Sequence, residues 1–394
     1  MNQAADDSGA DRWMLVGQSG NPDAWIAGTE AAGQVAGPDV KLLLLFCSES
    51  YDLEQLLAAV NQAAGGAALI GCSTSGEIAT NGPSESSVVL TAFGGSGFNV
   101  GVSCAVNASE NLRSAGALAA GAIDDAGDMN HKILLILSDG LAGDQQEIVR
   151  GAYSVVGATV PLVGGCAGDD LKMRATYQFF GDQVLTNAVV AAAVGSDSPF
   201  GIGVRHGWRT VGDPMVVTSS NGREALTLDD TPALDAYIDR LKAPPQARTD
   251  PDEFIRFAMT HPLGLSGRTT EPHARYVAEA DFDRRALICI AEVPEGTLAW
   301  IMEGDDASVL EATDTACTQA LTALGDRQPV GVLAFDCIAR RGVLGEAGIK
   351  NEIDRIGALC KGVPIAGFYT YGEIARTNGI GGFHNQTLVV LAVS

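Results

Sequence analysis

Two nine-residue segments of the chain share one pattern of glycine, threonine and glutamate. They read Gly-Cys-Ser-Thr-Ser-Gly-Glu-Ile-Ala at 71–79 and Gly-Phe-Tyr-Thr-Tyr-Gly-Glu-Ile-Ala at 367–375. Glycine lets a strand end abruptly with its amide groups exposed, and the hydroxyl and carboxylate groups beside it can then contact a small ligand. The predicted ligand-binding residues are Thr74, Glu77, Phe368, Tyr369, Thr370, Tyr371 and Glu373.

A structural interpretation of the same segments stands beside the ligand-binding one. Gly76 and Gly372 would form tight turns, and the two glutamates would accept hydrogen bonds from loop amides. Aromatic residues favour the second segment as a pocket wall, so we expect Tyr369 and Glu373 to serve the ligand and Glu77 to serve stability.

Catalytic chemistry finds little support in the sequence. Cys72, Ser73, Thr74 and Cys337 lie near glycine turns, but no G-x-S-x-G elbow, Walker lysine loop or H-E-x-x-H helix accompanies them. Hydrolase or transferase activity is therefore the disfavoured alternative, and we expect the protein not to be an enzyme.

The elements that must position the repeated segments alternate between strand and helix. The apolar run 41–46 is typical of a strand buried on both faces, and a helix with one apolar face follows Asp52. The same order recurs near 131–163 and 330–366, with a weaker copy of the glycine pattern at 161–170 that carries Asp169. We predict an α/β fold with two domains built from repeated βαβ units, whose mixed, largely parallel sheets are flanked by helices.

Composition restricts the partners. The net charge of −23 repels phosphate backbones and anionic lipid, so neither nucleic acid nor a membrane is an expected partner. The eight cysteines are scattered without C-x-x-C spacing, and the N-terminus has no basic segment followed by an apolar one. A cytoplasmic location is expected.

Four motifs occur in an order that resembles the FIST sensory proteins. They are the segment 71–78, Pro-Leu-Val-Gly-Gly-Cys-Ala-Gly-Asp at 161–169, His-Gly-Trp at 206–208, and 367–374. The resemblance implies a FIST N-terminal domain, placed at 24–225, and a FIST C-terminal domain at 226–394, with 1–23 as an expected disordered tail. One departure falls at 336–341, where the chain reads Asp-Cys-Ile-Ala-Arg-Arg and the resemblance leads us to expect Ser-Cys-Ala-Gly-Arg.

The resemblance implies a small-ligand sensor in bacterial signal transduction. Some family members bind haem b, sense nitric oxide and regulate a partner histidine kinase of a two-component system, so haem is one expected cofactor. A cyclic-dinucleotide signalling enzyme is the other expected partner, and an amino acid or other small polar metabolite is the alternative ligand. Of the five histidines, His261 is the predicted ligand of the haem iron and His206 the second choice.

Overall fold

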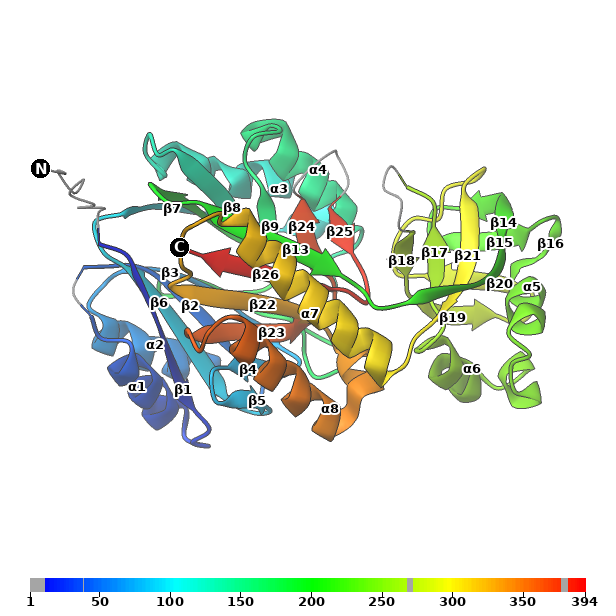
Figure 1. Ribbon diagram of the computed structural model, residues 1–394, viewed down its shortest axis with the longest axis horizontal. Helices are drawn as coiled ribbons and strands as arrows, with labels where there is room; N and C mark the ends of the chain where they lie inside the picture. The colour runs from blue at the N-terminus through cyan, green and yellow to red at the C-terminus, as the bar shows by residue number, and fades with distance from the viewer. Residues whose placement is uncertain (1–10, 38, 268–271, 377–381) are drawn as a thin grey trace, which may run out of the picture.

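The computed structural model describes residues 11–37, 39–267, 272–376 and 382–394. The predicted α/β fold is confirmed, because helices flank several mixed sheets (Figure 1). Residues 1–10 of the expected tail lie outside the described residues. Strand β1 (Trp13–Ser19) falls within the segment 1–23 and pairs antiparallel with β6 (Val88–Gly94), so the ordered chain begins before residue 24.

The larger body of the molecule consists of three units with one order of elements: strand, helix, strand, helix, strand, hairpin, strand. The first unit adds to β1 and β6 the elements α1 (Ala24–Gln34), β2 (Val40–Ser48), α2 (Leu53–Ala64), β3 (Ala68–Thr74), β4 (Glu77–Ala79) and β5 (Gly82–Ser84). The second has β7 (Phe98–Val106), α3 (Leu112–Ala119), β8 (His131–Ser138), α4 (Gln145–Val156), β9 (Leu162–Cys166), β10 (Gln178–Phe180), β11 (Gln183–Leu185) and β12 (Ala188–Ser196). The third has β13 (Phe200–Arg205), α7 (Asp306–Ala323), β22 (Gly331–Cys337), α8 (Ile338–Leu359), β23 (Ile365–Thr370), β24 (Glu373–Arg376), β25 (Phe383–His384) and β26 (Leu388–Val393).

Each unit completes its sheet with a hairpin from another unit. The sheet orders are β1-β6-β2-β3-β10-β11, β7-β12-β8-β9-β24-β25 and β13-β26-β22-β23-β4-β5. The first unit therefore gives its hairpin to the third, the third to the second, and the second to the first, which closes a ring. Each sheet contains one parallel pair, and its other pairs are antiparallel. Antiparallel pairing is thus more extensive than predicted, because the exchanged hairpins and the returning strands add to each βαβ unit.

The central strands are buried on both faces, as the continuous apolar runs predict. In β2, Leu42, Leu44 and Phe46 face the core shared by the three sheets, whereas Leu43 and Leu45 face α1 and α2. Phe335 of β22 and Phe368 of β23 complete an aromatic centre, with ring centroids of Phe46 and Phe368 4.8 Å apart. The helices lie outside this core and cover the outer faces of the sheets (Figure 1).

A smaller domain is inserted between β13 and α7 (Figure 1). Its sheet has the order β18-β17-β21-β14-β15-β20-β19, with β16 paired to β15. The elements are β14 (Arg209–Asn221), β15 (Glu224–Leu228), β16 (Thr231–Pro232), α5 (Ala233–Arg240), α6 (Pro251–Ala258), β17 (Leu263–Leu265), β18 (His273–Arg275), β19 (Val277–Asp281), β20 (Ala286–Cys289) and β21 (Leu298–Glu303). The predicted division between residues 225 and 226 falls within β15, inside this inserted domain.

None of the helices in the described part of the chain has the length and apolar character needed to cross a membrane.

Candidate ligand-binding site

Glu77 is fully buried after the turn that joins β3 to β4. One carboxyl oxygen accepts the backbone N–H of Ser87 at 3.1 Å and the Ser87 hydroxyl at 2.6 Å, and Thr74 donates its hydroxyl to the other oxygen. Burial raises the pKa of Glu77 to about 7, although these hydrogen bonds oppose the shift. Thr74 and Glu77 therefore hold the segment just before β6 in place through hydrogen bonds.

Glu373 occupies the corresponding position in the third unit. Its Oε2 accepts the backbone N–H of Thr387 at 3.0 Å, just before β26, and burial raises the pKa of this carboxyl group well above its usual range. The hydroxyl of Thr370 donates to the carbonyl of Gly372 at 2.7 Å and accepts the N–H of Cys166 at 3.0 Å. In both matching segments the glutamate thus binds the chain just before the last strand of its unit. This agrees with the structural interpretation of the sequence pattern.

Asp169, the acid of the weaker third copy, organises a loop at the surface of the second unit. Its carboxylate accepts the backbone N–H groups of residues 173–175 at 2.7 to 3.1 Å. The Tyr371 hydroxyl donates to the same carboxylate and accepts the N–H of Leu171 at 2.7 Å. Burial opposes ionisation of Asp169, but these hydrogen bonds prevail and lower its pKa. The loop is therefore held in one shape by a side chain from the third unit.

That loop contains three non-glycine residues in the left-handed region of the backbone. Asp170, Leu171 and Met173 have φ angles of 55°, 61° and 52°. Such a conformation costs about 1–2 kcal/mol for a residue with a Cβ, so the fixed hydrogen bonds around Asp169 must stabilise it. Leu171 and Met173 leave 57% and 60% of their surface exposed within this one loop.

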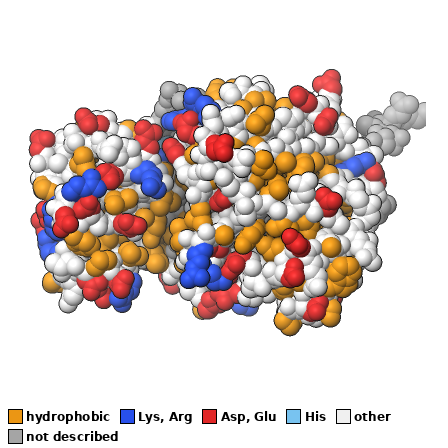
Figure 2. Space-filling model, turned by 180° about the vertical axis from the view of Figure 1, so that it is seen from behind, with side chains coloured by type: hydrophobic (Ala, Val, Ile, Leu, Met, Phe, Trp, Pro, Cys, Tyr) orange, Lys and Arg blue, Asp and Glu red, His pale blue; other side chains and the backbone are white. Residues whose placement is uncertain are grey.

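A cavity of about 920 Å³ lies between this loop, the start of α8 and the inserted domain. Its size is within the range that holds small ligands and cofactors. Figure 2 shows hydrophobic side chains on both the larger body and the smaller lobe beside the narrow seam that separates them. The large apolar and aromatic residues on the body side are Leu141, Leu171, Met173, Ile338, Tyr371 and Phe383. The inserted domain contributes Ile255, Met259, Tyr276 and Ile290.

Arg341 is the charged residue most deeply set in the cavity wall, with only 11% of its side chain exposed. It donates to the carbonyl of Ser75 at 2.8 Å, forms an ion pair with Glu85 and lies 3.6 Å from Glu346. Its guanidinium carbon is 5.1 Å from the ring centroid of Tyr369, within cation–π range. Arg341 thus links the first unit to α8 at the edge of the cavity.

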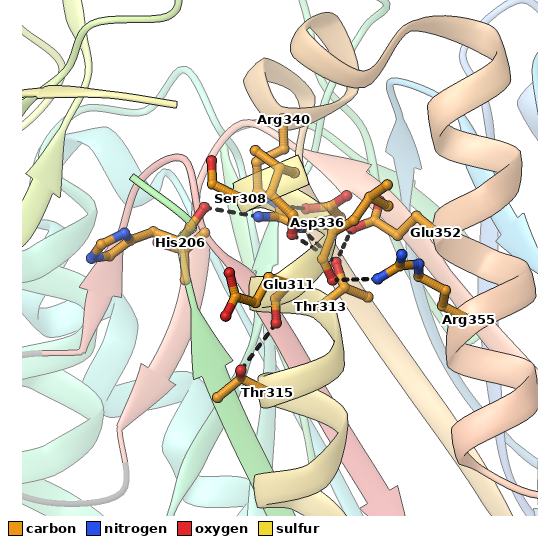
Figure 3. Close-up of polar contacts among 12 residues, drawn as sticks. His206, Ser308, Glu311, Thr313, Thr315, Asp336, Arg340, Glu352 and Arg355 are labelled. Atoms are coloured by element: carbon orange, nitrogen blue, oxygen red, sulfur yellow. Dashed lines mark hydrogen bonds and ion pairs between the residues drawn. The ribbon is translucent and has the colours of Figure 1, made fainter. Parts of the chain in front are cut away.

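Behind the cavity wall, Arg340 joins the start of α8 to the base of the inserted domain (Figure 3). Its buried guanidinium contacts Asp336 and Glu352 at 2.6 Å each, the Thr313 hydroxyl at 3.0 Å and the carbonyl of His206 at 2.8 Å. Burial and the nearby Glu352 raise the pKa of Asp336 well above its usual range, although Arg340 opposes the shift. Removing either partner would leave a buried charge uncompensated, so this network fixes the relative position of α7, α8 and the segment that leads from β13 to the inserted domain.

The structure places most of the predicted ligand residues away from the cavity. Four of them are buried and hold neighbouring loop segments through hydrogen bonds: Thr74, Glu77, Thr370 and Glu373. Phe368 lies in the central aromatic core, and Tyr369 is buried beneath Arg341. Tyr371 is the predicted residue that lines the cavity. The sequence analysis did not identify Arg341, Leu171 and Met173 as candidate ligand-binding residues. The departure from the family pattern at 336–341 was the available signal, because Cys337, Ile338, Ala339 and Arg341 from that segment all line the cavity.

The two predicted iron ligands also lie outside the cavity lining. His261 stacks on Phe257 at 4.3 Å between ring centroids, and its Nδ1 is 2.8 Å from the carbonyl oxygen of Phe257. The Nδ1 of His206 accepts the backbone N–H of Trp208 at 2.9 Å. Among the described lining residues none is a histidine, so the cavity does not fit a histidine-ligated haem. Nor do three or more His, Cys, Asp or Glu side chains in the described ranges form a group that could hold a metal ion.

Fold and cavity together define an α/β protein with a preformed space for a small ligand. The chain belongs to the FIST family: the FIST N domain matches residues 41–231, and the FIST C domain matches residues 233–376. Domains of this family are sensors that bind small ligands in signal transduction.

Similar proteins cover nearly the whole chain. An uncharacterized protein of Mycobacterium tuberculosis is 26% identical over 394 residues, which span 94% of this chain and 97% of the relative. An uncharacterized protein of Mycobacterium bovis is 26% identical over 396 residues, with 94% and 96% covered. Among solved structures, the cyanuric acid hydrolase of A. caulinodans aligns with 98% of this chain and 100% of its own, at 11% identity and a TM-score of 0.35. That likeness is too low to bear on fold or activity.

Proposed function

We propose that the protein is a signal-transduction sensor whose small ligand binds in the cavity between the three-unit body and the inserted domain. The main support for this proposal is the strained loop at 170–173. Apolar side chains held exposed at a backbone cost, beside a cavity, are typical of a ligand clamp. Ligand bound there would touch α8 and the inserted domain at once, so its binding energy can favour one arrangement of the two.

Blocking the cavity tests this proposal. Ala339 lines the cavity on α8, whereas Ala347 on the same helix is exposed and does not. We expect Ala339→Phe to abolish the thermal stabilisation that any metabolite gives to the wild type, and Ala347→Phe to preserve it. A metabolite that stabilises the wild type and Ala339→Phe equally would place the ligand elsewhere.

We propose that binding occurs without turnover. The Cys337 thiol lines the cavity but is 5% exposed, and burial together with Glu373 raises its pKa well above the usual range, which disfavours a thiolate nucleophile. The Ser73 hydroxyl donates to the carbonyl of Gly168 at 2.8 Å and accepts the N–H of Tyr177 at 2.9 Å, so it is fully engaged. Enzyme-proportional hydrolysis that Cys337→Ala removes would contradict this view.

The proposed output is control of a histidine kinase or a cyclic-dinucleotide signalling enzyme, in a cytoplasmic setting. This part rests on the family resemblance. It is tested by the autophosphorylation rate of a histidine kinase encoded beside the gene, measured with the apo and the ligand-bound protein. Equal rates in both states would argue against that kinase as the partner. Haem bound through His261 or His206, outside this cavity, with nitric oxide as the signal, is the family-based alternative, and the absence of a Soret band after haem reconstitution would remove it.

A further inference from the structure

The charges around the cavity are unevenly divided between its two sides. The body side carries three carboxylates, Glu85, Asp170 and Glu346, against one guanidinium, Arg341, which gives a net charge of −2. The inserted domain contributes one charged lining residue, Arg223, which is exposed to solvent. Glu85, Asp170 and Glu346 are also exposed, so solvent screens the charges on both sides, and the body side keeps the larger net charge. A ligand that enters the cavity therefore meets a negative wall on the body side.

The cations near this wall are already engaged. Arg341 is bound by the carbonyl of Ser75 and by Glu85, and the ammonium group of Lys172 pairs with Glu49. An anionic ligand would have to displace these carboxylates and also approach Asp170. It would lose more in broken ion pairs than a single new contact with Arg341 returns.

Asp170 has no ion pair of its own among the described residues. The Ser48 hydroxyl lies 3.5 Å from its Oδ2, and its backbone N–H donates to the Ser75 hydroxyl at 3.2 Å. Partial burial and the neighbouring Glu49 and Glu85 raise the pKa of Asp170, although Lys172 and Arg341 oppose the shift. A carboxylate in that setting gains from a cation that comes with the ligand.

The rest of the cavity lining is largely apolar, so it favours a ligand whose cationic group is attached to an apolar body. Leu171 and Met173 stand exposed next to Asp170, and Ile255 and Ile290 lie on the opposite wall. The rings of Tyr276 and Tyr371 also line the space, and tyrosine faces attract ammonium groups. We propose that the cavity takes an organic cation, an amine or quaternary ammonium group carried on an apolar body, with the charged group at Asp170 and the body between Met173 and the inserted domain. This inference rests on the proposed sensor function and names its ligand class.

A matched series of six-carbon probes tests the charge preference. Hexylamine, hexyltrimethylammonium, hexanol and hexanoate share one apolar chain and differ in the charge of the head group. Ligand-observed NMR titrations should give the two cations a Kd about tenfold lower than that of hexanol, the effect of one charge-assisted contact, with hexanoate weakest. The preference should also shrink as salt is added.

Two variants that remove the same charge test whether the preference for cations depends on Asp170. Asp170→Asn should raise the Kd of both cations to that of hexanol and leave hexanol itself unchanged. Asparagine tolerates the left-handed φ of 55° at this position, so the loop is kept. Asp182→Asn removes the same charge from an exposed position outside the cavity and should change nothing.

The remaining outcomes distinguish failure of the cation preference from failure of the cavity as the ligand site. If hexanoate binds most tightly, or if all four probes bind equally, the cation proposal is overturned while the cavity remains a ligand site. If the probes bind Ala339→Phe as tightly as the wild type, or if none shows saturable binding to the wild type, the cavity itself fails as the site and the proposed function falls with it.

Discussion

At the scale of single residues, Glu77 makes stability depend on pH in a predictable direction. Its folded-state pKa of about 7 exceeds the ordinary value of 4.5, so the folded protein holds the proton more tightly than the unfolded chain. The stabilisation that this proton gives is complete below the unfolded pKa and is lost as pH rises through the folded pKa.

Glu77→Gln removes that titration. We expect the variant to be less stable than the wild type at pH 5, because the amide places two N–H donors where the protonated carboxyl of Glu77 places one O–H. Its deficit should shrink by up to about 3 kcal/mol between pH 5 and pH 8, since only the wild type loses stability there. Urea unfolding across that pH range measures the difference. Glu54→Gln, at an exposed position on α2, is the control and should show a constant difference. A Glu77→Gln deficit that stays constant from pH 5 to pH 8 would mean that the carboxyl group is ionised when folded.

Residue patterns predicted the junctions but not which side chains face the ligand cavity. The glycine spacing located the turns after β3 and β23 correctly, because a strand-to-turn junction is a local feature. Whether Tyr369 or Tyr371 points to a cavity depends on which face of β23 meets α8, and that is settled by packing between units. The exposed, strained Leu171 and Met173 carry no local signature, since neither residue type favours a positive φ.

At the scale of elements, α8 is divided at Gly345. This residue has φ 59° and ψ −178°, a region open almost only to glycine, and it lines the cavity. The sequence predicts a helix between the strands of 330–366, and Ile349, Ile353 and Ile356 recur there at helical spacing in the second part of α8. The bend was not predicted, because a glycine among good helix formers does not reveal its ψ angle.

Gly345→Ala isolates the effect of this bend. An added Cβ would meet nothing within 4 Å, so the cost is purely conformational, about 1–3 kcal/mol of unfolding free energy. We also expect weaker ligand binding, because relief of the strain would shift 338–344 in the cavity wall. Gly33→Ala in α1 is the matched control, since its Cβ also meets nothing within 4 Å and its backbone is helical. It should raise stability by about 0.5–1 kcal/mol. Equal effects of the two substitutions would rule out a conformational role for Gly345.

At the scale of the whole molecule, the inserted domain is joined to the body through two neighbouring strands. Arg209 of β14 and Glu303 of β21 are antiparallel partners, so a short turn can replace residues 210–302. We expect this shortened protein to keep the three-unit body, with its three shared sheets, and to unfold in one cooperative transition. It should bind none of the cavity ligands, because Ile255, Met259, Tyr276 and Ile290 are removed. Circular dichroism and the probe titrations check the two expectations, and an unfolded product would show that the body depends on the insert.

The ring of exchanged hairpins also sets the order of events on the ribosome. Hairpin β4–β5 is made early, yet its partner β23 follows far along the chain: Thr80 and Ile365, which share a hydrogen bond, are 285 residues apart. At about 5 to 20 residues per second, synthesis of the intervening chain takes about 15 to 60 s. During that time the hairpin has an open edge, which is a site for misassembly with other nascent chains. Translation speed and chaperone supply should therefore affect the yield of this protein more than that of a chain whose sheets are each complete within one unit.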